Sequence, residues 1–275
     1  MKKLFAIIVA LFLVLYSTIG CLPAAQPSTN LVVHFIDVGQ GDAILIDSGE
    51  TEVLIDGGSA GSGVADYISA YVDGPLEVII ITHPHEDHIG GLPEVFTDYV
   101  VKDVWWSGKT STSNIFKTLN NCIIAENATA HEAERGMSIT AGTLKFNVIN
   151  PAKPLPSDIN NGSVVVTLSY GQTDFIFTGD AEQEAETDML LWLKDIDILK
   201  VGHHGSNTAS SAAFLQIIKP EVAVYIAGVG NSYGHPHTET ITALTNIGAT
   251  IYGTDTLGTI VITTDGKTYS IQTEK

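Results

Sequence analysis

The sequence predicts an α/β fold arranged as a four-layer αββα sandwich, in which two sheets pack together and helices cover both outer faces. Two observations lead to this prediction. Short apolar runs rich in β-branched residues recur in both halves of the 275-residue chain, with helical segments between them. The histidines and the conspicuous acidic residues fall directly after these runs, as expected where strands end at a common edge that gathers a ligand. A helical layer on each sheet would bury the apolar faces of both.

The first half begins with a predicted hairpin. Residues 31–37 and 43–47 are apolar runs separated by Gly39-Gln40-Gly41-Asp42, a composition typical of a turn between two strands. The other elements expected in this half are a strand at 52–55, a helix at 64–71 and a strand at 77–82.

The second half repeats the pattern of strands that end at polar residues. Strands are expected on both sides of a Gly171-Gln172 turn, and the second of them ends at Gly179-Asp180. The predicted strands are 163–170, 173–178, 197–201, 222–226, 250–252, 259–263 and 268–271, and the predicted helices are 182–193, 209–218 and 238–247. Each half is therefore expected to provide one of the two sheets.

The N-terminus has the composition of a secretory signal peptide. Two lysines precede an apolar run of 13 residues at 4–16, which is shorter than the roughly 20 that a membrane-spanning helix needs. Thr-Ile-Gly-Cys at 18–21 resembles a lipoprotein signal in which Cys21 receives the lipid anchor. We expect a signal peptide at 1–20, a tether at 21–30 and a globular domain at 31–275, extracytoplasmic and held at the membrane. Simple secretion and an uncleaved anchor are the alternatives.

The net charge of the chain disfavours some classes of partner. Acidic residues outnumber basic ones 31 to 13, for a formal charge of -18. Such a surface repels polyanions, which counts against a wide nucleic-acid groove but not against a small phosphate-containing substrate. The other cysteine, Cys122, lies in an apolar run and is expected to be a buried core thiol. The sequence indicates no protein partner.

A dense run of metal-binding side chains follows the strand at 77–82. Its residues are His83, Pro84, His85, Glu86, Asp87 and His88. Imidazole nitrogens and carboxylate oxygens suit Zn²⁺ and related divalent ions. His83 and His85 can point the same way and bind one ion, while Asp87 and His88 can turn to a second ion beside it. The alternative is a solvated histidine-rich turn.

The motif His-x-His-x-Asp-His after a strand resembles the signature of the metallo-β-lactamase superfamily, and the resemblance extends over 31–271. It implies the metallo-β-lactamase fold and a hydrolase domain at 31–275. It also implies that Asp56 orients the metal site, that Asp180 bridges two metals, and that His203 or His204, with His204 favoured, is the last histidine ligand. The alternatives are a turn residue for Asp56 and a helix N-cap for Asp180.

Three segments resemble one branch of that superfamily. Residues 34–43, 199–206 and 233–236 are similar to the hydrolase domain of the DNA-uptake competence protein ComEC and to secreted phosphorylcholine esterases. By this resemblance His235 would contact the leaving group or phosphate; otherwise it is a surface loop histidine. His237 begins a helix and is expected at its cap.

One departure from the broad superfamily concerns the first metal. A third histidine usually completes that site, but the sequence has Asn160-Asn161-Gly162-Ser163 at the expected place, as the ComEC-like branch does. His131 lies well upstream in an acidic stretch. The first metal is therefore expected to have His83, His85, Asp180 and water, with an amide nearby.

These features predict a metallo-hydrolase with two divalent ions, Zn²⁺ first and Mn²⁺ as the alternative. The ions would hold a hydroxide oriented by Asp87 or Asp180, with His235 stabilising charge that develops on the substrate. The expected substrate is a phosphodiester, with DNA as one form of it. Lactam, lactone or thioester hydrolysis is a second interpretation, and a non-catalytic, metal-dependent binding lipoprotein is a third. Gly-x-Ser-x-Gly and a phosphate-binding Gly-x-x-x-x-Gly-Lys-Ser/Thr loop are absent from the sequence.

Overall fold

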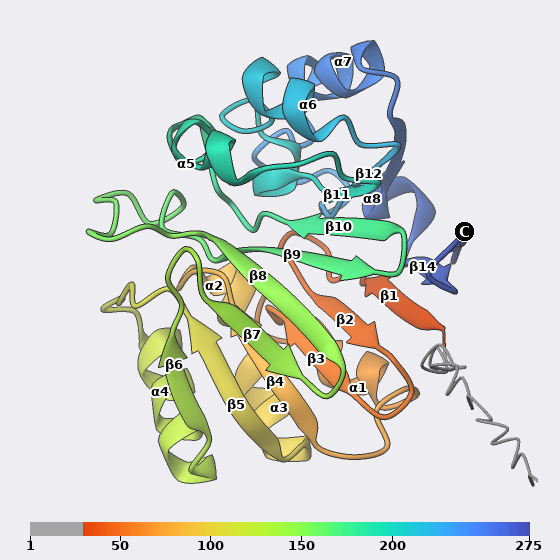
Figure 1. The fold of residues 1–275 in the computed structure, drawn as a ribbon. Helices are drawn as coiled ribbons and strands as arrows, with labels where there is room; N and C mark the ends of the chain where they lie inside the picture. Colours follow the sequence, from red (N-terminus) through yellow and green to blue (C-terminus); the bar gives the residue numbers. More distant parts are fainter. Residues whose placement is uncertain (1–29) are drawn as a thin grey trace, which may run out of the picture.

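The computed structural model describes residues 30–275 and shows two mixed β-sheets packed together, with helices on both outer sides (Figure 1). The predicted α/β sandwich is confirmed. The predicted signal peptide, the lipid-anchor cysteine Cys21 and all of the tether except residue 30 lie outside the described residues.

The first sheet has eight strands and combines both ends of the described chain. Its strands run parallel from β3 to β6, and the other neighbours pair antiparallel. In sheet order they are β15 (Tyr269–Thr273), β14 (Ile260–Thr264), β1 (Leu31–Phe35), β2 (Ile44–Asp47), β3 (Glu52–Ile55), β4 (Leu76–Ile81), β5 (Val101–Trp106) and β6 (Thr129–Glu132).

The second sheet has seven strands. Its strands run parallel from β10 to β13, and antiparallel pairs join β7 to β10. In sheet order they are β13 (Thr250–Gly253), β12 (Val222–Tyr225), β11 (Ile198–Lys200), β10 (Thr173–Phe177), β9 (Val165–Tyr170), β8 (Leu144–Asn150) and β7 (Ser138–Ala141).

Helices cover each sheet on the side away from the other sheet (Figure 1). On the first sheet they are α1 (Val64–Ile68), α3 (Leu92–Asp98) and α4 (Asn114–Glu126), and on the second they are α5 (Gln183–Met189), α6 (Ala212–Ile218) and α7 (Thr238–Asn246). The remaining helical elements are α2 (Glu86–Ile89), α8 (Thr254–Leu257) and the 3₁₀ turns Leu190–Trp192 and Gly202–Gly205. Within residues 30–275 we find no helix with the length and apolar character to cross a bilayer.

Apolar side chains hold the layers together both between the two sheets and between a sheet and its helices. Between the sheets, buried Phe35 and Phe177 face each other with ring centroids 6.3 Å apart. Behind the second sheet, Phe214 and Leu215 of α6 belong to the same buried cluster as Leu199 of β11. Burying a side chain of this size contributes about 1.5–3 kcal/mol. These contacts fix the two sheets relative to each other, so that loops at their common edge have defined positions.

Several details differ from the sequence-based expectation, among them the predicted helices 64–71 and 209–218, which the structure shortens to Val64–Ile68 and Ala212–Ile218. The two halves do not each form one sheet, because β14 and β15, from the second half, join the first sheet beside β1. The predicted helix at 182–193 ends at Met189 and continues as a 3₁₀ turn. Cys122 is half-buried rather than fully buried, and it packs against the apolar cluster that contains Phe35 and Phe177. All predicted strands are present, with ends within two residues of those expected, but α2 to α4 and β5 to β8 were not predicted.

Candidate metal centre

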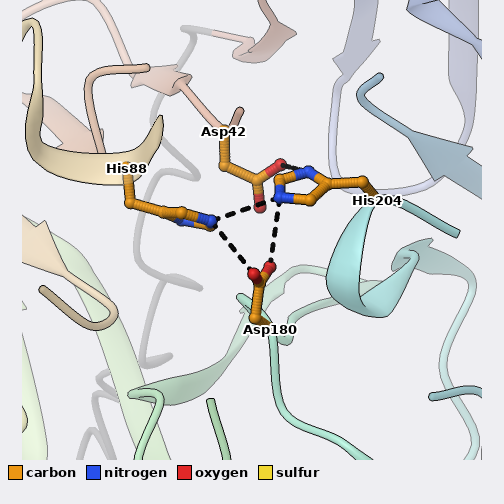
Figure 2. Close-up of side chains that lie close together, drawn as sticks. All are labelled: Asp42, His88, Asp180 and His204. Atoms are coloured by element: carbon orange, nitrogen blue, oxygen red, sulfur yellow. Dashed lines mark hydrogen bonds and ion pairs between the residues drawn. The ribbon is translucent and has the colours of Figure 1, made fainter. Parts of the chain in front are cut away.

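Four side chains from distant parts of the chain converge at the edge where the parallel strands end. Asp42, His88, Asp180 and His204 each offer a ligand atom, and these atoms lie within 4.8 Å of one another (Figure 2). They come from the β1–β2 loop, from α2, from the end of β10 and from the turn after β11. The prediction that histidines and acids after different strands would meet is confirmed.

Asp180 belongs to two such groups. Together with His83 and His85 it forms another set of possible metal ligands whose atoms meet the same distance limit. Its Oδ2 lies 3.6 Å from Nε2 of His83 and 3.3 Å from Nε2 of His88, and its Oδ1 lies 3.5 Å from Nε2 of His204. Asp180 is buried, and Oδ1 has no hydrogen-bond partner among the described residues. A buried carboxylate that is surrounded by imidazoles and has one oxygen without a hydrogen bond fits a divalent cation.

Backbone contacts hold the histidine-rich loop against its neighbours. The amide of Asp42 donates to the carbonyl of Asp87 at 3.1 Å, and that of Gly57 donates to the carbonyl of His88 at 2.7 Å. Gly41 permits the first contact, because a Cβ built on it would come 2.2 Å from the Asp87 carbonyl oxygen. The loops after β1, β3 and β4 therefore form one braced edge.

Asp56 lies behind His88 and outside the ligand groups. Its Oδ2 is 2.7 Å from Nδ1 of His88, and its carboxylate also accepts hydrogen bonds from the amide and hydroxyl of Thr82 at 2.8 and 2.6 Å. The Nδ1 proton is thereby held toward Asp56, which leaves Nε2 of His88 to face Asp180. Such a pair fixes both the tautomer and the orientation of a ligating histidine.

The turn after β11 separates the two neighbouring histidines. His203, His204 and Gly205 all have left-handed backbones, with φ of 48°, 55° and 86°. Consecutive non-glycine residues in this region are uncommon and cluster at functional sites. His204 is buried with Nε2 in the cluster, whereas His203 lies at the rim, with Nδ1 3.1 Å from Glu182 and Nε2 3.7 Å from Asp180. His203 belongs to neither ligand group.

Sequence reasoning missed two residues behind His204. Oδ1 of Asp42 lies 3.3 Å from Nδ1 of His204, which also faces the carbonyl of Ile226 at 3.1 Å. Oδ2 of Asp42 forms an ion pair of 2.6 Å with Nζ of Lys200, and both residues are buried. A lysine inside an apolar strand is the signal that would have indicated this pair, since lysine is almost never fully buried without a partner.

The place of the missing third histidine is occupied by hydroxyl and amide groups. Oγ of Ser163 lies 3.4 Å from Nδ1 of His83 and accepts a hydrogen bond from the amide of Asp180. The side-chain oxygen of Asn161 accepts from the amides of Glu182 and Ala185, so it is Asn161, not Asp180, that satisfies the start of α5. His131 is remote from the cluster: it bonds Asp103 and stacks on Trp105.

A cavity of about 530 Å³ opens over the cluster. The residues that line it are Gln40, Ser59, His85, Glu86, Asp87, Asn160, Asp180, His203, His204, Tyr233 and His235. Oδ2 of Asp87 lies 3.4 Å from Nε2 of His204, and the ring of His235 lies 6.2 Å from that of His204. His237 is the N-cap residue of α7, as expected. The cavity thus joins the buried ligand groups to solvent.

The histidines and carboxylates of the cluster shift one another's pKa values. Burial would raise the pKa of Asp180, but His88 and His204 outweigh it and hold that pKa well below its usual range. Burial would lower the pKa of His88 and of His204, but the nearby carboxylates raise both well above the usual value. Burial lowers the pKa of His83 far below the usual value. A divalent cation can take over the charge balance that protons otherwise provide here.

Comparison with known proteins agrees with this geometry. The model of the metallo-β-lactamase superfamily matches residues 36–105 and 152–229. "ComE operon protein 3" of Bacillus subtilis is 31% identical over 251 residues, which cover 83% of this chain and 32% of that protein. "Competence protein ComA" of Neisseria gonorrhoeae is 28% identical over 233 residues, 82% of this chain and 31% of that protein. The chain therefore spans about a third of the length of these relatives.

A solved structure agrees at the level of the fold. The metallo-β-lactamase fold protein YhfI from Bacillus subtilis superimposes with a TM-score of 0.59 and 13% identity, covering 86% of this chain and 100% of that chain. The competence-protein relatives confirm the branch that the sequence motifs indicated. With its sandwich of two sheets and its histidine–aspartate cluster able to hold metal ions, this chain belongs to the metallo-β-lactamase superfamily.

Proposed function

We propose that this protein is a metal-dependent phosphodiesterase or nuclease that acts outside the cytoplasm. The observation that carries the proposal is Asp180, one buried carboxylate that belongs to both ligand groups and retains an oxygen without a hydrogen-bond partner in the described chain. A carboxylate in this position can bridge two divalent cations. Zn²⁺ suits the imidazole and carboxylate donors best, and Mn²⁺ is the alternative.

We assign the ligands from the direction of each side chain. The first ion would be held by His83, His85 and Asp180, and the second by His88, Asp180 and His204. Asp87 belongs to neither ligand group, and we add it to the second because its Oδ2 lies 3.4 Å from Nε2 of His204. Asp42 satisfies the distance limit for a ligand, but one of its oxygens pairs with Lys200 and the other faces Nδ1 of His204. We therefore place Asp42 behind His204. His203, at the rim, is placed to donate a hydrogen bond to the substrate.

The bound ions would supply a reactive water, with a pKa near 7, and polarise the phosphoryl group. Burial would raise the pKa of Asp87, but a hydrogen bond with His204 and the charge of His88 outweigh it and hold that pKa below its usual range. Asp87 is therefore ionised at neutral pH and can accept a hydrogen bond from that water. Its position at the cavity wall fits this orienting role.

His235 is placed to act on the other side of the substrate. Burial, with the charges of His204 and His203, lowers the pKa of His235 to about 4, so its ring is neutral at pH 7. Its Nδ1 has no hydrogen-bond partner within residues 30–275. A neutral imidazole donates one hydrogen bond. We propose that His235 donates it to a phosphate oxygen or to the leaving group.

One feature favours a phosphodiester over the other substrate classes, and a second limits its size. The name of one relative refers to competence, and the sequence resembles the hydrolase domain of a DNA-uptake protein. The charge of -18 counts against a long DNA track on the surface. We therefore propose that the substrate is a small phosphodiester or a single-stranded nucleic acid, with DNA as one source of it.

A panel of chromogenic substrates tests the activity. With added Zn²⁺ or Mn²⁺ we expect the protein to release 4-nitrophenolate from bis(4-nitrophenyl) phosphate. Hydrolysis of nitrocefin or of a thioester, without phosphodiester cleavage, would favour the lactam, lactone or thioester interpretation. Stoichiometric metal with turnover of no substrate would leave the non-catalytic binding lipoprotein.

A variant tests the assignment of the first group. His85→Ala is expected to lose the ion of that group and the activity with it, because His85 is one of only two imidazoles assigned to that ion. Metal content by elemental analysis and hydrolysis rates are measured on the same samples. A variant with normal metal content and turnover would refute the assignment of His85 as a ligand. The matched control is His131→Ala, which changes a histidine remote from the cluster.

We propose that residues 1–20 are a signal peptide, that 21–30 form a tether and that Cys21 carries a lipid anchor. The basic start, the short apolar run and the Thr-Ile-Gly-Cys segment support this. Labelling of the expressed full chain with a radioactive fatty acid tests it, with Cys21→Ala as the control. Equal labelling of both forms, or of neither, would contradict the lipid anchor.

A further inference from the structure

Tyr233 stands at the mouth of the cavity above the ligand groups. It lines the cavity, yet it is 65% exposed. Its ring lies against that of His235, with centroids 5.7 Å apart and an angle of 21° between the planes. His235 in turn lies 6.2 Å from His204, at an angle of 27°. A series of stacked rings therefore leads outward from the cluster and ends in an aromatic side chain open to solvent.

The loop that carries Tyr233 is braced from within. The side-chain oxygen of Asn231 accepts hydrogen bonds from the amides of Tyr233 and His235 at 3.2 and 3.0 Å. Its side-chain nitrogen donates to the carbonyls of Gly228 and His235 at 3.0 and 2.6 Å. A Cβ on Gly228 would come 2.8 Å from the backbone nitrogen of Gln40, so this end of the loop packs closely on the β1–β2 loop. An aromatic group on a braced loop binds a ligand at low cost in conformational entropy.

Within residues 30–275 the cavity offers no lysine or arginine to an anionic substrate. Neither Lys nor Arg is among the residues of the described chain that line it, whereas Glu86 and Asp87 are. Affinity for a phosphodiester must therefore come from the metal ions and from uncharged contacts. Of the residues that line this opening in the described chain, only Glu86 and Tyr233 are exposed, and Tyr233 is the uncharged one. Stacking of bases on aromatic side chains is the common way in which proteins hold single-stranded nucleic acid without reading its sequence.

We propose that Tyr233 is the stacking platform for a nucleobase of the substrate, adjacent to the phosphodiester that is cleaved. The proposal rests on the phosphodiesterase function and names its substrate class as nucleoside phosphodiesters. Every base has a flat face, so the platform favours a nucleoside ester over an alkyl ester and tolerates different bases. The expected preference is on the order of 10-fold to 100-fold, the range that stacking contributes per base.

Two esters with the same leaving group test the platform. Thymidine 5′-(4-nitrophenyl phosphate) and methyl 4-nitrophenyl phosphate both release 4-nitrophenolate, so the ratio of their kcat/KM values reports the nucleoside alone. We expect the metal-loaded full chain to prefer the thymidine ester. Tyr233→Phe keeps the ring and is expected to keep the ratio. Tyr233→Ala and Tyr233→Leu are expected to bring it close to one. Val229→Ala is the matched control, since Val229 is 78% exposed on the same loop but does not line the cavity.

Binding provides a readout that does not depend on turnover. By calorimetry, thymidine 5′-monophosphate is expected to bind more tightly than methyl phosphate to the wild-type chain, and Tyr233→Leu is expected to lose that difference while Tyr233→Phe keeps it. If Tyr233→Ala and Tyr233→Leu leave both the kcat/KM ratio and the affinity difference unchanged, the platform is refuted. If no ester is hydrolysed but the tyrosine-dependent affinity difference persists, the platform stands and the phosphodiesterase proposal fails.

Discussion

The two ligand groups around Asp180 differ in what stands behind their histidines. In the first group, Nδ1 of His83 faces only hydroxyl groups, those of Thr82 at 3.1 Å and Ser163 at 3.4 Å. The other histidine of this group, His85, is half-buried at the cavity wall. No carboxylate within the described chain is recorded against Nδ1 of His83.

In the second group a buried carboxylate stands behind each histidine. Asp56 is 2.7 Å from Nδ1 of His88, and Asp42 is 3.3 Å from Nδ1 of His204. Asp42 is in turn paired with Lys200, which has no exposed surface. A carboxylate behind a ligating histidine fixes its tautomer and raises its basicity, an effect typically worth about 10-fold to 100-fold in metal affinity. We infer that the second group binds its ion more tightly than the first.

Asp180→Ala should have the largest effect, because Asp180 is the one residue common to both groups. We expect the loss of both ions and a fall in kcat/KM on the order of 10³-fold or more, as for the removal of a key electrostatic group at an active site. Elemental analysis and the nitrophenyl ester assay measure the two effects. Retention of one ion at full occupancy would show that this ion does not need Asp180 and would contradict the bridging role.

Lys200→Met should have the next largest effect, on stability. It leaves Asp42 buried without its partner, and the free energy of unfolding should fall by about 3–5 kcal/mol. Urea denaturation of the metal-free protein measures it. The double variant Asp42→Asn/Lys200→Met removes both charges and should recover much of the loss. Lys102→Met is the matched control, because the pair of Lys102 with Glu77 is partly exposed and worth at most about 1 kcal/mol. A single variant as stable as that control would show that Lys200 does not brace the second group.

Asp56→Asn should weaken metal binding to the second group by about 10-fold to 100-fold, since the amide cannot replace the charge behind His88. The corresponding change behind His83, Ser163→Ala, removes the hydroxyl that faces His83 and accepts the amide of Asp180, both neutral contacts, and should cost about 10-fold at most in the first group. Competition titrations with a chromogenic chelator measure both affinities. Equal losses in the two variants would remove the distinction between the groups.

Treatment with a chelator should show the smallest effect, which is a difference between the two ions in how soon they leave the protein. Metal is expected to leave in two phases, first from the group with His83 and His85 and then from the group with His88 and His204. An affinity gap of about 10-fold is enough to separate the phases. The metal content after increasing exposure to a chelator, together with residual activity, follows this order. Loss of all metal in a single phase would contradict it.

Much of the candidate site could be predicted from the chain. The run from His83 to His88 has a composition typical of a metal site, and Asp180 and His204 follow strand ends in a recognisable order. Asp42 and Lys200 were missed because each looks ordinary where it stands: one as a turn residue, the other as one lysine in a strand. Their significance lies in a contact across 158 positions of the chain.

The pairing of strands in the two sheets was likewise only partly predictable from the sequence. Hydrophobic periodicity and composition located the strands, because the residues of a buried strand are themselves apolar and β-branched. They did not indicate that β14 would return to β1, since strand pairing depends on which edges remain open after the layers pack.

The sequence by itself determined the class of fold, the strand ends that carry the chemistry and most of the side chains suited to metal. Only the tertiary structure decided that His204 rather than His203 enters the cluster, that Asp42 and Lys200 pair behind His204, and that Tyr233 faces the opening. The physical reason is the distance along the chain over which each kind of interaction acts. Burial and local backbone preference act within a few residues, whereas the direction of a side chain in the site is set by partners that folding brings from far along the chain.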